Sequence, residues 1–315
     1  MSRIYEALQK AESERGSDAQ SRLEPNQSVA VADYDVPPGR VEAFAPRTRS
    51  AEVFGGYASE PAENVDMGQV PARPWSPDLR QLPALLGKGP AVEQFRSLRS
   101  RIYELRDVKP LKSILISSGM PQEGKSFVAT NLAISLARNK NAKVLLIDGD
   151  LRRYTIHQLL GCEAEPGLAE YLAGRATVLD VMQRPDAASI TAAAGTRVGG
   201  LASLTFIAGG NGGDRAADLS NHNRFGELLA AVSSQFDWII IDSSSVLPVS
   251  DAVNLSRSCD GVLLIARGGV TDYSDAQRAQ HEFKGANILG FVLNASEKPQ
   301  QVGTYYGYDP RHEGE

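Results

Sequence analysis

Eight consecutive residues, 119–126, have the types and spacing of a phosphate-binding loop, Gly-x-x-x-x-Gly-Lys-Ser. Glycine lets the backbone curl so that successive N–H groups point at one anion. The ammonium of Lys125 would face the β- and γ-phosphates of a nucleotide, and the hydroxyl of Ser126 would bind Mg²⁺. The predicted nucleotide-binding residues are Gly119, Met120, Pro121, Gln122, Glu123, Gly124, Lys125, Ser126 and Phe127.

Three aspartates follow apolar runs that are typical of buried strands. Asp148 and Asp150 come at the end of the run 143–148 and just beyond it, and Asp242 ends the run 238–242. Ligands of open α/β sheets bind beyond the carboxyl ends of the strands, so we expect these side chains to converge on the phosphates. Mg²⁺ prefers oxygen ligands, and a further carboxylate can accept the proton of an attacking hydroxyl.

The roles of four nearby polar residues are left open by the sequence. Arg152 and Arg153 follow the aspartates at once and could contact phosphate, a neighbouring subunit or solvent. Asp251 could cap a helix or line the site. Asn294 ends the last apolar run, where an amide could meet an adenine ring.

The elements that position these residues alternate between strand and helix from residue 112 onward. Most apolar runs are continuous, which is typical of parallel strands covered on both faces. The pattern predicts a doubly wound, mostly parallel α/β sheet of the phosphate-loop NTPase class. Residues 162–200 show only short helical pieces and a glycine-rich loop. The predicted strands are 113–117, 143–148, 204–208, 238–242, 261–266 and 288–293, and the predicted helices are 91–105, 127–138, 224–234, 252–257 and 275–283.

Composition divides the 315-residue chain into four parts. Residues 1–12 have apolar side chains at helical spacing, which predicts a docking helix or a frayed terminus. Residues 13–80 are rich in Pro, Gly, Ser, Glu and Arg, which predicts a disordered tether. The catalytic domain is expected at 81–301, followed by a flexible tail at 302–315 that carries Tyr305, Tyr306 and Tyr308.

Charge and cysteine content exclude several classes of function. The net charge is −5, which argues against bulk nucleic-acid binding. Cys162 and Cys259 lie far apart without metal-ligand spacing, which fits a reducing cytoplasm. No apolar run approaches the ~20 residues of a membrane span, so we expect any membrane association to depend on a partner.

Several motifs together resemble the bacterial tyrosine kinases that control exopolysaccharide and capsule synthesis. They are the loop ending in Glu-Gly-Lys-Ser, the runs Leu-Leu-Ile-Asp-Gly-Asp-Leu-Arg-Arg and Phe-Asp-Trp-Ile-Ile-Ile-Asp, and the stretch 246–252. The spacing of Glu93, Arg96 and Arg99 is similar to a helix that packs the kinase subunits of that family into a ring. The same three residues could equally form a solvated charged face.

The resemblance implies ATP as the phosphoryl donor and the tail tyrosines Tyr305, Tyr306 and Tyr308 as acceptors, with transfer expected between subunits. It implies Lys125 as the cation that offsets charge and Asp148 as the base. Ser126, Asp150 and Asp242 would hold Mg²⁺. The opening residues are similar to those of family members encoded apart from their membrane partner. A separate transmembrane chain-length regulator is therefore the expected activator, and it would hold the chain at the inner face of the plasma membrane.

The sequence departs from the family at several places. Met120–Gln122 replaces the usual lead into the loop, Phe127 stands where a small hydroxyl residue is common, and Ser243–Ser245 replaces Thr-Pro-Pro. Two other functions therefore stay open. One is a partition- or cell-division-type ATPase, which usually has a second lysine early in the loop. The other is a nucleotide-responsive assembly factor that transfers phosphate poorly.

Overall fold

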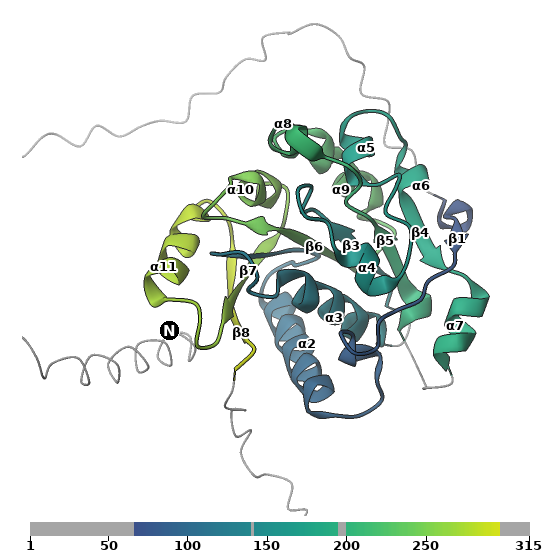
Figure 1. Ribbon diagram of the computed structural model, residues 1–315, viewed down its shortest axis with the longest axis horizontal. Coiled ribbons are helices and arrows are strands. Elements are labelled where there is room, and N and C mark those ends of the chain that lie inside the picture. Colours follow the sequence, from purple (N-terminus) through teal and green to yellow (C-terminus); the bar gives the residue numbers. More distant parts are fainter. Residues whose placement is uncertain (1–65, 140–141, 195–199, 297–315) are drawn as a thin grey trace, which may run out of the picture.

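The computed structural model describes residues 66–139, 142–194 and 200–296. The predicted docking helix, most of the predicted tether and the tail tyrosines lie outside these ranges. Strands of the described part form one eight-stranded sheet in the order β1-β4-β5-β3-β6-β2-β7-β8 (Figure 1). The strands are β1 (Ala72–Arg73), β2 (Ser113–Ser118), β3 (Val144–Asp148), β4 (Met182–Pro185), β5 (Leu204–Ile207), β6 (Trp238–Ser245), β7 (Gly261–Arg267) and β8 (Ile288–Asn294).

Helices cover both faces of the sheet (Figure 1). The longest, α2 and α3, lie on one face together with α4, whereas α5 and α8–α11 pack on the other. None of the described helices is long and apolar enough to cross a membrane. The helices are α2 (Pro90–Val108), α3 (Lys125–Ala137), α4 (Ile156–Leu160), α5 (Leu168–Leu172), α6 (Val178–Val181), α7 (Ala187–Ala194), α8 (Ala216–Ser220), α9 (Arg224–Val232), α10 (Asp251–Ser256) and α11 (Tyr273–Glu282).

Side chains of each central strand alternate between two hydrophobic cores. In β3, Val144 and Leu146 face α3, while Leu145 and Ile147 belong to the core under α9 and α10. This is why the central strands read as continuous apolar runs: both faces are buried, so neither tolerates polar residues. The predicted doubly wound sheet is confirmed, with parallel pairing except between β4 and β5.

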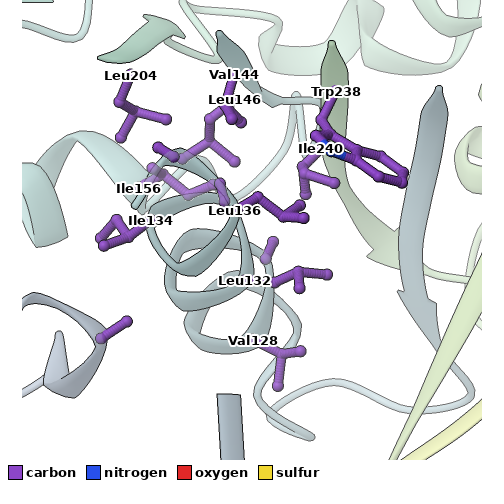
Figure 2. Close-up of a cluster of buried hydrophobic side chains, with 14 of the residues drawn as sticks. Val128, Leu132, Ile134, Leu136, Val144, Leu146, Ile156, Leu204, Trp238 and Ile240 are labelled. Atoms are coloured by element: carbon purple, nitrogen blue, oxygen red, sulfur yellow. The ribbon is translucent and has the colours of Figure 1, made fainter. Parts of the chain in front are cut away.

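Helix α3 is fixed on the sheet by a row of apolar residues. Val128, Leu132 and Leu136 lie at helical spacing and belong to the same hydrophobic core as Leu146 of β3 and Ile240 of β6 (Figure 2). Leu132 and Leu136 are fully buried, and each such side chain contributes about 1.5–3 kcal/mol to folding. The packing therefore sets where the first turn of α3, and with it Lys125, lies relative to the strand ends.

All six strands predicted from the sequence are present, with bounds within a few residues of those expected. The region 162–200 additionally contains β4, which pairs antiparallel with β5 through Met182 and Gln183. A run of four residues carries too little periodicity for a prediction.

One boundary differs from the sequence-based prediction. Residues 66–80, assigned to the tether, belong to the folded domain: β1 pairs with β4, and Val70 and Trp75 are buried. The indole Nε1 of Trp75 donates to Oε1 of Gln183 at 3.2 Å, and its backbone N–H donates to Oγ of Ser189 at 2.8 Å. A single buried tryptophan thus anchors a segment whose average composition resembles a disordered one.

Candidate nucleotide site

A cavity of about 360 Å³ lies where β2, β3 and β6 end and α3 begins. Nine of the candidate site residues named from the sequence line it: Pro121, Gln122, Gly124, Lys125, Ser126, Phe127, Asp150, Arg152 and Arg153. The other predicted site residues among those described do not line it. Its remaining walls are Thr155, Ser244, Ser245, Pro248 and Val249.

The backbone of the loop has the conformation that its glycines allow. Gly124 has a positive φ of 93°, and a Cβ there would lie 2.0 Å from Nδ2 of Asn294. Helix α3 begins at the next residue, so its free N–H groups and positive dipole end are directed to the cavity. An anion such as a phosphate is the ligand that this arrangement favours.

Glu123 supports the loop from behind instead of lining the cavity. Its buried carboxylate accepts the backbone N–H of Met120 at 2.8 Å and the hydroxyl of Thr271. Its carbonyl accepts Nδ2 of Asn294 at 3.0 Å, and the carbonyl of Gln122 accepts from Arg267 at 3.3 Å. Asn294 therefore holds the loop in this structure. Thr271 and Arg267 were not foreseen from the sequence, where nothing links them to the loop.

Lys125 is 8% exposed and its Nζ lies 3.1 Å from Oγ of Ser245, to which it donates. Ser245 and its neighbour Ser244 both line the cavity, and Oγ of Ser244 has no partner among the described residues. In the sequence these serines stood out only as departures from a family pattern, so their place in the site is a finding of the structure.

Asp148 is fully buried at the end of β3 and is saturated by backbone groups. Its Oδ1 accepts from the N–H of Asp150 at 3.3 Å, and its Oδ2 accepts from Thr155 and Ile156, each at 3.0 Å. Burial raises the pKa of Asp148 well above its usual value, and the neighbouring Asp242 adds to this effect. The side chain does not line the cavity.

Asp242 lies opposite Asp148 in the β3–β6 pairing and is equally buried. Neither of its carboxylate oxygens has a hydrogen-bond partner of normal geometry in the described chain, although the Ser126 hydroxyl and the Ser243 backbone N–H lie near enough to lower its pKa. Burial raises the pKa of Asp242 to about 7, against the opposing effect of the nearby Lys125 charge. Two unpartnered hard oxygens close to the Ser126 hydroxyl suit a divalent cation, directly or through water.

The described residues contain no group of three His, Cys, Asp or Glu side chains arranged to hold a metal ion. An all-protein cage is thus not part of this site as described. Mg²⁺ is commonly bound by one or two carboxylates, water and substrate phosphates, and Asp242 with Ser126 fits that pattern.

Asp150 and Arg152 border the cavity on the side of β3. Oδ1 of Asp150 accepts from the backbone N–H groups of Arg152 and Arg153 at 3.2 and 3.0 Å, which turns the chain after the strand. Nε of Arg152 lies 2.6 Å from Oδ2 of the buried Asp251 at the start of α10. Asp251 therefore connects α10 to the cavity wall and does not line it.

Glu93, Arg96 and Arg99 lie on α2, apart from the cavity lining. Arg96 forms an ion pair with Glu93 at 2.5 Å, and NH1 of Arg99 donates to the carbonyl of Ser135 in α3 at 2.7 Å. Arg99 thus helps to attach α2 to α3 within one chain, whatever it contacts in an assembly.

The chain is similar in sequence to curated tyrosine-protein kinases. No model of a known protein family matches the chain. It is 34% identical over 206 residues to tyrosine-protein kinase ptk of Acinetobacter johnsonii and 31% identical over 220 residues to tyrosine-protein kinase etk of Escherichia coli K12. These matches cover 65% and 69% of this chain, which spans only 26% and 28% of the two relatives.

Two solved kinase domains agree in structure. The kinase domain of Escherichia coli tyrosine kinase ETK matches with a TM-score of 0.59 and 31% identity, covering 69% of this chain and 80% of that domain. The VpsO kinase domain matches with a TM-score of 0.56 and 27% identity, covering 69% of this chain and 96% of that one. The chain therefore belongs to the bacterial tyrosine-kinase family.

Proposed function

We propose that this chain is an ATP-dependent protein-tyrosine kinase that phosphorylates its own tail and regulates exopolysaccharide or capsule synthesis. The observation that carries the proposal is the cavity at the N-terminus of α3. It combines the buried cation of Lys125, the carboxylate of Asp150 and, next to them, the unpartnered carboxylate of Asp242. Membership of the tyrosine-kinase family selects phosphoryl transfer to tyrosine from the reactions that such a cavity could perform.

In this reaction a tyrosine oxygen forms a bond to the γ-phosphorus of ATP, and the bond from that phosphorus to the bridging oxygen breaks. ADP leaves, and a carboxylate takes the proton of the tyrosine hydroxyl. The N–H groups of the loop and Lys125 would bind the phosphates and offset the charge that develops on the leaving oxygen. Ser126, Asp150 and Asp242 would hold Mg²⁺, which when bound neutralises part of the phosphate charge.

Two aspartates are candidates for the proton acceptor. The family resemblance implies Asp148, but that carboxylate is enclosed and already accepts three backbone N–H groups. Asp150 lines the cavity and is partly exposed. A general base must reach the proton that it accepts, so the geometry supports Asp150 better, and Mg²⁺ would then be held by Ser126 and Asp242 together with phosphate oxygens and water.

Tyr305, Tyr306 and Tyr308 are the proposed acceptors, although they lie outside the described residues. The structure follows the chain to Ser296, only two residues beyond the end of β8. A tail spans at most ~3.5 Å per residue, so a neighbouring subunit could be as accessible as the tail's own site. We propose transfer in trans within a ring that involves Glu93, Arg96 and Arg99. We further propose activation by a separate transmembrane chain-length regulator that holds the kinase at the membrane.

The test is the intact mass of the full chain after incubation with ATP and Mg²⁺. A kinase gains mass in steps of one phosphate, and the Lys125→Met chain gains none. Tandem mass spectrometry should place the phosphates on the three tail tyrosines. Release of inorganic phosphate without a mass gain would instead identify a partition-type ATPase. Binding of ATP with neither outcome, even with the regulator's cytoplasmic segment present, would identify an assembly factor.

A further inference from the structure

Two buried residues of opposite charge lie near each other at this site without forming an ion pair. Lys125 is 8% exposed and Asp242 is 0% exposed. The lysine is close enough for its charge to act on the aspartate. Yet no ion pair joins them in the described chain, and both oxygens of Asp242 lack a hydrogen-bond partner of normal geometry, with only the Ser126 hydroxyl and the Ser243 N–H nearby.

Such an arrangement is costly and needs a cause. A buried carboxylate without a partner keeps its full desolvation penalty, and pairing with a neighbouring ammonium would relieve part of it. A lysine ammonium is carried on a flexible four-carbon chain, so we would expect it to turn toward the carboxylate. Instead, Nζ of Lys125 donates to the hydroxyl of Ser245 at 3.1 Å.

An irregularity of β6 places this hydroxyl. Ile116 pairs with Asp242, but Ser118 pairs with Ser245, so two steps along β2 correspond to three along β6. An extra residue of this kind reverses the alternation of side chains and re-aims the ones that follow.

The irregular segment is held firmly on both sides. Oγ of Ser243 donates to the carbonyl of Ile116, and Oγ of Ser117 donates to the carbonyl of Ser244, both at 2.9 Å. The backbone N–H of Val246 donates to the carbonyl of Ser118 at 2.9 Å. Ser245 therefore presents its hydroxyl from a fixed backbone.

We propose that Ser245 is a positioning residue that holds the Lys125 ammonium away from Asp242, which keeps both carboxylate oxygens of Asp242 available for the divalent cation of the nucleotide complex. Without this hydroxyl, Lys125 pairs with Asp242 and competes with the cation for it. This inference rests on the proposed function, because it assumes that the cavity binds a nucleotide with Mg²⁺.

The test measures the affinity of the full chain for ADP by calorimetry, once with Mg²⁺ and once with EDTA. The dissociation constant in EDTA divided by the one in Mg²⁺ reports how much the cation contributes to binding. This ratio needs no catalytic turnover. Ser245→Val and Ser245→Thr form the matched pair, because they have nearly the same shape and both suit a strand, but only threonine keeps the hydroxyl. Ser245→Ala is a second variant without the hydroxyl, in case the valine chain does not fold.

Ser245→Val should reduce the ratio by about tenfold relative to Ser245→Thr, the size expected for one hydrogen bond to a charged group. In an Asp242→Asn background the two substitutions should give the same ratio, since the competing carboxylate is gone. Ser256→Ala is the control: Ser256 is 5% exposed, as buried as Ser245, and lies in α10 outside the cavity lining. It should leave the ratio unchanged.

Equal ratios for the valine and threonine chains, with tight binding of ADP and Mg²⁺ in both, would overturn the role of Ser245 and leave the proposed function intact. A difference of the same size in the Asp242→Asn background would also overturn it, because the effect would then not pass through Asp242. If the unsubstituted chain binds no ADP in either buffer, the proposed function fails and this inference fails with it.

Discussion

The ends of β3 and β6 carry two aspartates in the same structural position with opposite surroundings. Asp148 and Asp242 are directly paired across the two strands, and both are fully buried. Asp148 accepts three backbone N–H groups, two of them from the residues that start α4, whereas no described group donates to Asp242 with normal hydrogen-bond geometry. Equal burial at one sheet edge thus does not imply equal function.

The difference follows from what comes after each strand. After β3 the chain turns at once, and its N–H groups at residues 150, 155 and 156 fold back over Asp148. After Asp242 the chain continues as strand and pairs again with β2 at Ser245, so no turn folds back over the Asp242 side chain. One carboxylate is satisfied by the fold, and the other keeps capacity for a ligand that the fold alone does not supply.

Removing the charge of Lys125, beside Asp242, should have the largest effect. Lys125→Met keeps the apolar stem and the backbone of the loop but removes the charge that faces the phosphates. We expect ATP turnover to fall by about 10³-fold, as for loss of one preorganised electrostatic group, with the fold retained by circular dichroism. Lys109→Met, at an exposed position beyond α2, is the control. Normal turnover in a folded Lys125→Met chain would exclude this cavity as the active site.

Asp150→Asn should show whether Asp150 or Asp148 accepts the proton of the tyrosine hydroxyl. Its side-chain oxygen can still accept the N–H groups of Arg152 and Arg153, so the turn is retained. Phosphoryl transfer in a single turnover should fall by roughly 10²-fold, the usual scale for a lost general base, while ADP still binds. If transfer is normal in Asp150→Asn and lost in a stable Asp148→Asn chain, Asp148 is the base instead.

The comparison of the two strand ends also shows what the sequence could and could not supply. The loop, the six strands and the three aspartates are visible because glycine spacing and apolar runs are local signals. The pairing of Lys125 with Ser245 and of Glu123 with Thr271 depends on segments about 120 and 148 residues apart, respectively. No local pattern encodes such contacts, so Ser245 could be noticed only as an unusual residue.

The sequence also could not show that backbone N–H groups occupy both oxygens of Asp148, because those hydrogen bonds depend on how the chain folds after β3. A strand that ends in aspartate is compatible with a base, a metal ligand or a cap, and the choice depends on the path of the following turn. The packing of residues 66–80 was missed because a two-residue strand and two buried side chains, Val70 and Trp75, decide it, whereas composition averages over the whole segment. Local signals therefore predict which residues gather at the strand ends, and long-range contacts decide which of them face the cavity.

Asp148→Asn should destabilise the fold, whereas Asp242→Asn at the neighbouring strand end should not. An asparagine has a single side-chain oxygen, so at least one of the three backbone N–H groups would face an NH₂ group. We expect the free energy of unfolding to decrease by about 2 kcal/mol, the cost of leaving a buried donor unsatisfied. Urea unfolding in EDTA without nucleotide measures this. An unchanged midpoint would show that these N–H groups find other partners.

Asp242→Asn should have the smallest effect and the opposite sign. No described group donates to this carboxylate with normal hydrogen-bond geometry, and an asparagine oxygen can still accept from the nearby Ser126 hydroxyl or Ser243 N–H, so the replacement mainly removes a buried charge. We expect the free energy of unfolding in EDTA to increase by about 1 kcal/mol.

The pKa of Asp242 is raised to about 7 in the folded chain from 3.8 for a free side chain. A carboxyl with a raised folded-state pKa loses stability as the pH rises from its unfolded value through its folded value. The advantage of asparagine should therefore be near zero at about pH 4 and grow until the pH passes about 7. Added Mg²⁺ and ADP should reverse the order, because they stabilise the unsubstituted chain through Asp242 and the asparagine chain much less. A loss of stability in EDTA at every pH would mean that Asp242, like Asp148, is held by the fold, and the contrast between the two strand ends would disappear.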